Sequence, residues 1–226
     1  QWECPLVETP CPGNDIGFKP RWTHSTPEMA RPLVAANFKA VSCASNVAYP
    51  PVAALSTRTH LKALGIPSAG TGKDRSEARE PATFETKGQR VALLSYTSVF
   101  WPIEQPATET TPGVATIKAH TGYVPGRRAL EMPGAAPEIQ TWADTQELAD
   151  MQADIAAAKK NADLVILACH WGVSSQEDVT TYQREIAHTA VEAGAGLIYG
   201  AHPHKIQGIE VYQGVPIFYS LGNFAF

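Results

Sequence analysis

The sequence predicts an α/β protein built on a sheet of mixed strand directions. Two observations lead to this class. Short apolar strands alternate with amphipathic helices, and the segment ADLVILAC at 162–169 is apolar on both faces, as in a central parallel strand. Two hairpin signals add antiparallel pairs. The chain has 226 residues, 44% hydrophobic and 18% charged, so it can bury a sizeable core, and whole-chain disorder is excluded.

In the first half of the chain, capping and turn residues delimit the expected elements. After a Pro- and Gly-rich loop over 1–25, Thr26 precedes Pro27 and supplies a helix N-cap. Gly65 stops a second helix, and Lys87-Gly88 separates two alternating segments as in a hairpin. The expected helices span 26–37 and 52–64, and the expected strands span 40–43, 82–86 and 90–96.

The second half continues the alternation. Thr180 and Gln183 form a capping box, and Gln213-Gly214 is the turn of a second hairpin. The expected helices span 144–160 and 180–193, and the expected strands span 162–169, 197–199, 209–212 and 215–221. The stretch 101–143 has no clear periodicity, so we expect an irregular covering loop there.

The charge balance excludes some classes of function. The formal net charge is −4, whereas a protein that binds duplex DNA needs a basic face. No apolar run approaches the ~20 residues that cross a bilayer, so no membrane span is expected.

Four cysteines are present, and their spacing matches neither a zinc ribbon nor a redox pair. In an oxidising compartment a disulfide could join Cys4 to Cys11, because the Pro-rich segment between them can turn; the alternative is that they stay unbridged. Cys43 and Cys169 each close an apolar run and are expected to be small buried hydrophobic residues.

Histidines follow two of the expected strands. His170 comes directly after the strand at 162–169, and His202 and His204 flank Pro203 after the strand at 197–199. Residues two apart in an extended chain point to one side, so these two imidazoles can face a common centre. A single histidine at a strand end is more often a hydrogen-bonded loop residue, but three at neighbouring strand ends favour a metal or anion site.

Paired basic residues lie within the irregular stretch. Arg127 and Arg128 follow Gly126, and two adjacent guanidinium groups can clamp a carboxylate or phosphate. A solvated loop is the equally plausible alternative. The substrate expected from this pattern is an anionic small molecule or polymer.

Three segments resemble the bacterial capsule-synthesis CapA family, the accessory proteins of poly-γ-glutamate synthesis. They are HWG at 170–172, GAHPHKIQGIEVYQGVPIFYSLGNFAF at 200–226, and FKAVSCASN at 38–46. The segment at 63–85 resembles the stretch that links these motifs in the family, so the likeness covers nearly the whole chain.

The resemblance implies a calcineurin-like metallophosphoesterase fold, in which two mixed β-sheets form a sandwich flanked by helices. It also implies a divalent metal, Mn, Zn or Fe, at the strand ends. By position, the metal ligands would be Glu3, Asn46, His170, His202 and His204. His170 and His204 would also take part in catalysis. Asn223 would contact substrate or support the site by hydrogen bonding; a simple turn residue is the alternative.

The chain departs from the family pattern at several positions. The family's Asn-Asn-His reads Ser45-Asn46-Val47 here, and valine can neither protonate a leaving group nor steady an oxyanion. Pro50 replaces an Asp, and Ser174-Ser175 replaces an acid. The strand that opens the family's fold and supplies a carboxylate ligand is missing, so we expect residues 1–226 to be a single domain truncated at both ends.

Two classes of function remain. The first is a metal-dependent hydrolase that acts on a phosphoester or amide of an anionic substrate in poly-γ-glutamate or capsule metabolism. The second is a non-catalytic accessory or polymer-binding protein, favoured by Val47. The resemblance also implies a location in the cell envelope or outside the cell.

Overall fold

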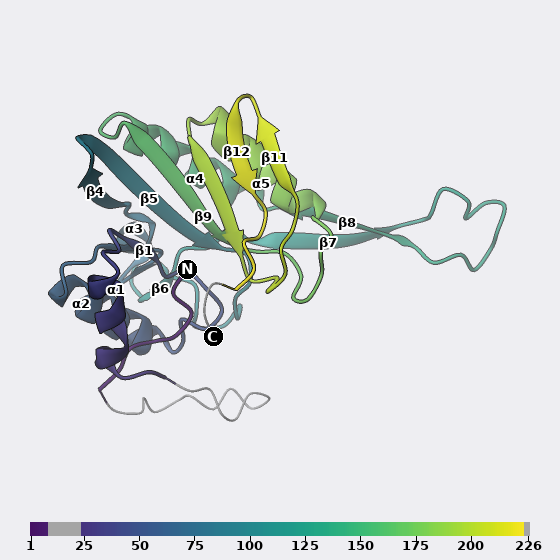
Figure 1. The fold of residues 1–226 in the computed structure, drawn as a ribbon. Coiled ribbons are helices and arrows are strands. Elements are labelled where there is room, and N and C mark those ends of the chain that lie inside the picture. The colour runs from purple at the N-terminus through teal and green to yellow at the C-terminus, as the bar shows by residue number, and fades with distance from the viewer. Residues whose placement is uncertain (9–23, 224–226) are drawn as a thin grey trace.

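A six-stranded mixed sheet forms the centre of the protein, as the computed structural model shows for residues 1–8 and 24–223 (Figure 1). The order across the sheet is β11-β12-β10-β9-β5-β4. These strands are β4 (Ala82–Thr86), β5 (Gln89–Thr97), β9 (Leu164–His170), β10 (Leu197–Ala201), β11 (Ile209–Tyr212) and β12 (Val215–Phe218). The α/β class expected from the sequence is therefore confirmed.

The four inner strands β12, β10, β9 and β5 are mutually parallel, and the edge strands β4 and β11 are antiparallel to their neighbours. Both edge strands arise from the expected hairpins, whose turns place Lys87, Gly88, Gln213 and Gly214 at positive φ. Because the inner strands are parallel, their carboxyl ends meet at one edge of the sheet. His170, the last residue of β9, is paired there with Thr97 of β5 and Ala201 of β10.

Two helices, α4 (Thr145–Lys159) and α5 (Thr181–Glu192), cover one face of the sheet (Figure 1). The Asp144 carboxylate caps α4 by accepting from the backbone N–H groups of residues 146 and 147, and the expected capping box begins α5. Met151, Ile155 and Ile186 are fully buried in the main core, which also contains apolar side chains of β5, β9 and β10.

Part of the amino-terminal half of the chain covers the other face, where Ala69 packs against Leu93 and Ala168. The elements of this half are a 3₁₀ helix (Pro27–Ala30), α1 (Arg31–Ala35), β1 (Val41–Ser42), α2 (Pro51–Ala63), β2 (Ser68–Ala69), β3 (Thr71–Gly72), α3 (Arg75–Arg79) and β6 (Gly113–Val114). Of these, α3 packs its Ala78 into the main core on the α4 side. The helix expected at 26–37 begins after Thr26 but is 3₁₀ over its first turn. The second sheet of the expected sandwich is represented by short pairs, β1–β2 and β3–β6.

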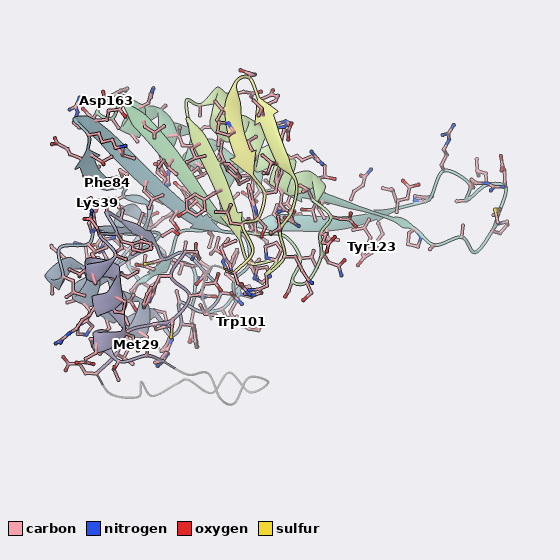
Figure 2. All side chains as sticks on the ribbon, viewed as in Figure 1. Met29, Lys39, Phe84, Trp101, Tyr123 and Asp163 are labelled. Atoms are coloured by element: carbon pink, nitrogen blue, oxygen red, sulfur yellow. The ribbon has the colours of Figure 1, made fainter. Side chains whose placement is uncertain are left out.

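The stretch 101–143 is not the irregular covering loop that we expected. Within it, β7 (Ala119–Val124) and β8 (Glu138–Ala143) pair as an antiparallel ribbon that projects away from the sheet (Figures 1 and 2). Tyr123 and Ile139 lie opposite each other and are 71% and 66% exposed. Because much of the ribbon is solvated, burial does not impose the alternating apolar pattern by which strands are recognised in a sequence.

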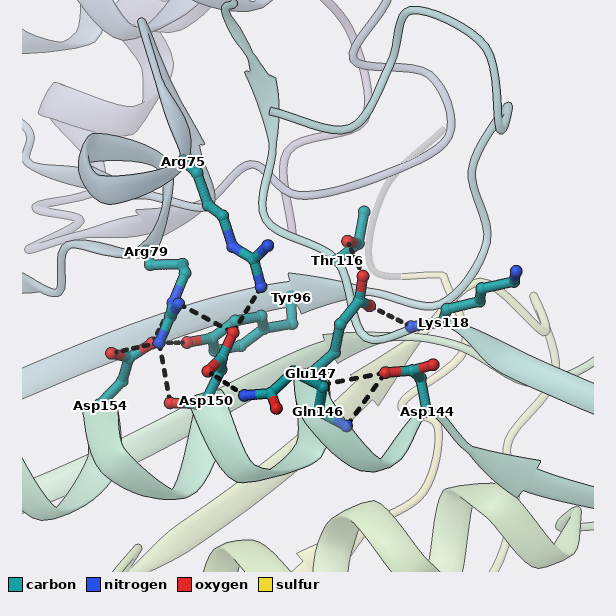
Figure 3. Close-up of polar contacts among 10 residues, drawn as sticks. All are labelled: Arg75, Arg79, Tyr96, Thr116, Lys118, Asp144, Gln146, Glu147, Asp150 and Asp154. Atoms are coloured by element: carbon teal, nitrogen blue, oxygen red, sulfur yellow. Dashed lines mark hydrogen bonds and ion pairs between the residues drawn. The ribbon is translucent and has the colours of Figure 1, made fainter. Parts of the chain in front are cut away.

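An ionic network ties α3 to α4 (Figure 3). Arg79 donates from Nε and Nη2 to the two carboxylate oxygens of Asp154, at 2.6 and 2.9 Å, and lies 3.1 Å from Asp150. Tyr96 of β5 donates its hydroxyl to Asp154, and Arg75 pairs with Asp150. Burial and the Asp154 carboxylate raise the pKa of Tyr96 well above its ordinary value, so the hydroxyl keeps the proton that it donates.

Cys43 and Cys169 are buried, and burial raises the pKa of the Cys43 thiol to about 12. Cys11 lies outside the described residues, so its bridge to Cys4 stays a prediction. Over the described ranges, none of the helices is both long and apolar enough to cross a membrane.

The network predicts an unequal response to removal of two arginines. Arg79→Met leaves the Asp154 carboxylate partly buried without its bidentate partner, and we expect the free energy of unfolding to fall by about 2 kcal/mol. Arg128→Met removes an exposed pair with Glu131, whose side chains are 69% and 73% exposed, and should cost under about 0.5 kcal/mol. Urea unfolding of both variants measures the difference, and equal losses would contradict this account.

Candidate functional site

The three predicted histidines gather at the carboxyl edge of the sheet. His170 ends β9 and is fully buried, whereas His202, which follows β10, is half-buried. The ring centroids of these two imidazoles are 4.8 Å apart, and His204 lies 6.0 Å beyond His202. The parallel pairing of β9 with β10 brings them together, since it sets His170 beside Ala201.

Close packing of the backbone around Gly200 positions the loops that carry the histidines. Gly200 lies between Trp171 and Tyr219: a Cβ at this position would stand 2.2 Å from the indole nitrogen and 2.1 Å from the Tyr219 carbonyl oxygen. The same indole nitrogen donates to that carbonyl at 2.7 Å. Only glycine permits this approach, and it keeps the two histidine-bearing strand ends in register.

The backbone of the His-Pro-His turn is strained. His202 has a φ of 95° and His204 a φ of 56°, positive values that only a few per cent of non-glycine residues adopt. Strain of this kind persists only where surrounding contacts impose it. The Pro203 carbonyl accepts from the backbone N–H of Ser175 at 2.8 Å, which joins this turn to the loop after His170.

Asn46, which the family resemblance gives as a metal ligand, has its side-chain oxygen in contact with His170. Its Oδ1 accepts from His170 Nε2 at 2.9 Å, across 124 residues of sequence. Because an amide oxygen only accepts, Nε2 carries the imidazole proton, and Nδ1 presents a lone pair. Burial, followed by the neighbouring His202 and His204, lowers the pKa of His170 well below its ordinary value. The imidazole is therefore neutral at pH 7.

Glu3 faces the other ring nitrogen of His170. Its Oε1 lies 3.6 Å from His170 Nδ1, beyond hydrogen-bond distance, and Nδ1 is buried without a hydrogen-bond partner among the described residues. Burial raises the pKa of Glu3, although His204 and the amino terminus oppose the shift. A carboxylate and an imidazole lone pair that face each other at this distance leave a place that suits a proton or a cation.

The separation of Glu3 Oε1 and His170 Nδ1 is compatible with two ligand atoms of one divalent metal ion. Ligand atoms bonded at about 2.1 Å to one tetrahedral ion stand about 3.4 Å apart, close to the separation seen here. A carboxylate also supplies the charge neutralisation that imidazoles lack. However, within residues 1–8 and 24–223 no three His, Cys, Asp or Glu side chains lie together as a metal-binding group. The donor chemistry fits a metal, and the complete ligand set is not assembled.

His204 and Asn223 are brought together at the rim of the site. His204 Nδ1 lies 2.8 Å from Asn223 Oδ1, and both residues are exposed. Since the amide oxygen accepts, the His204 proton is on Nδ1 and its Nε2 carries the lone pair. The predicted support of the site by Asn223 therefore acts through His204.

Arg127 and Arg128 are not brought to the histidines. They lie in the exposed connection between β7 and β8, at the far end of the projecting ribbon (Figure 1). Arg128 pairs with Glu131 of the same connection, and the Arg127 backbone donates to Glu138. Any anion that they bind in this arrangement is bound away from His170.

Two buried glutamines join loops near the site, a role that the sequence did not indicate, since it singled out Gln183 only for the capping box. Gln183 Nε2 donates to Gln207 Oε1 at 3.0 Å, and Gln207 Nε2 donates to the carbonyls of Gln176 and Asp178. These bonds attach the loop after His170 to the loop after His202. Gln207 lies within the GAHPHKIQG segment, and its closeness in sequence to two histidines is the signal that could have identified it as a residue of the site.

Residues 3–226 match the family described as bacterial capsule synthesis protein PGA_cap. The chain belongs to this family. The match includes all five of the predicted ligand positions. The resemblance expected from the HWG, GAHPH and SLGNF segments is thereby confirmed.

Curated relatives carry names from capsule synthesis. The chain is 32% identical over 158 residues to the PGA biosynthesis protein CapA of Bacillus subtilis, covering 70% of this chain and 34% of that protein. It is 29% identical to the capsule biosynthesis protein CapA of Bacillus anthracis, covering 74% and 34%. A probable polyglutamine synthesis accessory protein of Mycobacterium tuberculosis is 28% identical, covering 72% and 38%. The chain thus spans little more than a third of the length of these relatives.

Among solved structures, a putative 5′-nucleotidase from Staphylococcus aureus in complex with α-ketoglutarate aligns with 89% of this chain and 38% of its own. The TM-score is 0.40 and the sequence identity 16%, a likeness too low to support an inference about activity.

The strained turn predicts an unusual order of stability for two substitutions. At His202 the glycine variant should be more stable than the alanine variant by about 1 kcal/mol, because only glycine adopts positive φ without cost. Thermal unfolding of His202→Gly and His202→Ala measures the difference.

The control is Lys205, which lies two positions beyond the turn's centre and is not at positive φ. There Lys205→Ala should be at least as stable as Lys205→Gly. If alanine were the more stable substitution at position 202 as well as at position 205, the His202 backbone would not be strained.

Proposed function

We propose that this chain is the metal-binding part of a hydrolase that acts on a phosphoester or amide of an anionic substrate in poly-γ-glutamate capsule metabolism. The observation that carries the proposal is the buried His170 Nδ1, which has no hydrogen-bond partner among the described residues and faces the Glu3 carboxylate at 3.6 Å. A desolvated lone pair beside a carboxylate costs free energy unless a cation or proton lies between them.

In this proposal Glu3, His170 and His202 hold the cation, and His204, whose Nε2 lone pair is needed for proton transfer, is not a ligand. Asn46 orients the His170 ring by accepting its Nε2 proton, so that Nδ1 remains a ligand atom. A bound divalent cation supplies an activated water and polarises the oxygen of the scissile group. His170 is fully buried, so its role is to bind the ion rather than to touch substrate.

His204 is the histidine that a substrate can reach. It is exposed, and its proton on Nδ1 is held by Asn223, which leaves Nε2 able to accept a proton. A general base needs an accessible lone pair, and this ring has one. We therefore assign the predicted catalytic role to His204, with Asn223 fixing its tautomer.

The anionic substrate class rests on the relatives. The names of these relatives refer to PGA and polyglutamine synthesis and to capsule biosynthesis. This chain covers 34% to 38% of their lengths. A polyglutamate carries a carboxylate on every residue. The exposed Arg127 and Arg128 on the projecting ribbon offer such a polymer a contact separate from the histidine cluster.

A non-catalytic accessory protein is the second candidate. It is favoured by Val47, which occupies the position of the family's histidine and cannot transfer a proton, and by the lack of an assembled three-ligand group over the described residues. In that case the chain keeps the family's fold and binds polymer without cleaving it.

The first test is metal binding. Isothermal titration of the chain with Mn²⁺ and with Zn²⁺ should show one tight site, and His202→Ala should weaken it by more than about 10-fold, the effect of losing even an outer partner of a ligand. His188→Ala is the matched control, since His188 lies on α5 and pairs with Glu210 of β11, away from the site. Equal affinities in both variants would overturn the proposed site.

The second test separates the hydrolase from the accessory protein. The metal-loaded chain is assayed against p-nitrophenyl phosphate and against poly-γ-glutamate, with Glu3→Gln as the disabled variant. A hydrolase should show turnover that falls by about 100-fold or more in Glu3→Gln, because the metal site loses its carboxylate. Polymer binding without turnover, unchanged by Glu3→Gln, would instead establish the accessory role.

A further inference from the structure

Gln105 is a fully buried polar residue outside the predicted site. It lies in the segment that connects β5 to β6, and its side chain is 0% exposed. Its backbone carbonyl accepts from Val114 of β6 at 2.9 Å, which fixes the residue to the scaffold. Gly113 approaches so closely that a Cβ there would stand 2.3 Å from this same carbonyl oxygen.

Both the nitrogen and the oxygen of the Gln105 carboxamide make hydrogen bonds, and their partners lie in one loop and one turn. Its Nε2 donates to the carbonyls of Ser45 and Ala48, at 3.0 and 3.2 Å, and its Oε1 accepts from the backbone N–H of Trp101 at 2.7 Å. Both amide protons therefore hold the loop at 45–48. No other natural side chain of this length offers two donors and an acceptor in this arrangement.

Asn46 lies between the two carbonyls that Gln105 holds. Its own side chain reaches His170 Nε2 at 2.9 Å, and this bond leaves the lone pair of His170 on Nδ1, toward Glu3. The backbone of the loop itself contributes two turn bonds: the N–H of Ala48 donates to the Ser45 carbonyl at 3.2 Å, and that of Tyr49 to the Val47 carbonyl at 2.8 Å. The position of Asn46 thus depends on a residue that is not itself in contact with His170.

We propose that Gln105 is a positioning residue, which holds the loop at 45–48 so that Asn46 sets the tautomer of His170. The proposal rests on the proposed metal site for its consequence in binding, but its structural part concerns the metal-free protein alone. Loss of the two amide donors leaves the Ala48 carbonyl without a hydrogen-bond partner among the described residues and the Ser45 carbonyl with only the Ala48 backbone N–H, so the loop moves toward water.

The test is Gln105→Met, which keeps the length of the side chain and removes its donors. In the metal-free protein, amide exchange of Ala48 should accelerate by about 10-fold or more as the loop opens. Nitrogen NMR of His170 should show loss of the single Nε2-protonated form. Mn²⁺ affinity, measured by titration, should fall by about 10- to 100-fold, as for the loss of other outer partners of a ligand.

Asp144→Ala is the control, because it removes the N-cap of α4 and destabilises the protein without touching the loop at 45–48. If Gln105→Met matched Asp144→Ala in exchange, tautomer and affinity, the positioning role would be overturned. If the wild-type chain bound no Mn²⁺, the proposed function would fall, and the exchange and tautomer measurements would still decide the role of Gln105. If Gln105→Met did not fold, Gln105→Asn, whose amide is too short to span both carbonyls, replaces it with the same expected results.

Discussion

A histidine without access to water is the constraint around which this site is arranged. Burial at the end of a central strand excludes the charged imidazolium, because a buried charge without compensation is costly. The neutral ring of His170 then needs an acceptor for one nitrogen and a donor or cation for the other. Asn46 meets the first need, and the amino-terminal segment brings Glu3 toward the second. Both partners come from the layer that covers the face opposite α4 and α5, so the site requires that layer to be docked on the sheet.

Several features that hold this arrangement lower the stability of the fold. His202 and His204 adopt backbone angles that favour glycine, and buried glutamines use their amides to fix loops rather than to join regular elements. Such features cost conformational free energy and are retained where geometry matters more than stability. By contrast, α3 and α4 are joined by an ionic network whose carboxylates and guanidinium groups satisfy one another, as expected for a connection with a structural task.

Family membership and the departures from the family pattern bear on different parts of the site. His170, His202 and His204 lie together at the carboxyl edge of the sheet, and Glu3 lies beside His170. Val47 lies in the same loop as Asn46, one residue on, so loss of the family's histidine there leaves the Asn46 contact intact. The contact between Asn46 and His170 therefore does not depend on the residue at position 47.

The sequence by itself determined the local elements and the identity of the donors. The capping box at Thr180, the hairpin turns at Gly88 and Gly214, and the apolar run of β9 are short-range signals, and the last of these places His170 at a strand end. Only the tertiary structure decided what those donors face. The short strands β2, β3 and β6 and the ribbon β7–β8 form because they have pairing partners, and solvation of the ribbon hides its alternation from the sequence. The contacts of His170 with Glu3 and Asn46 span more than a hundred residues, and no local pattern encodes a distance of that kind.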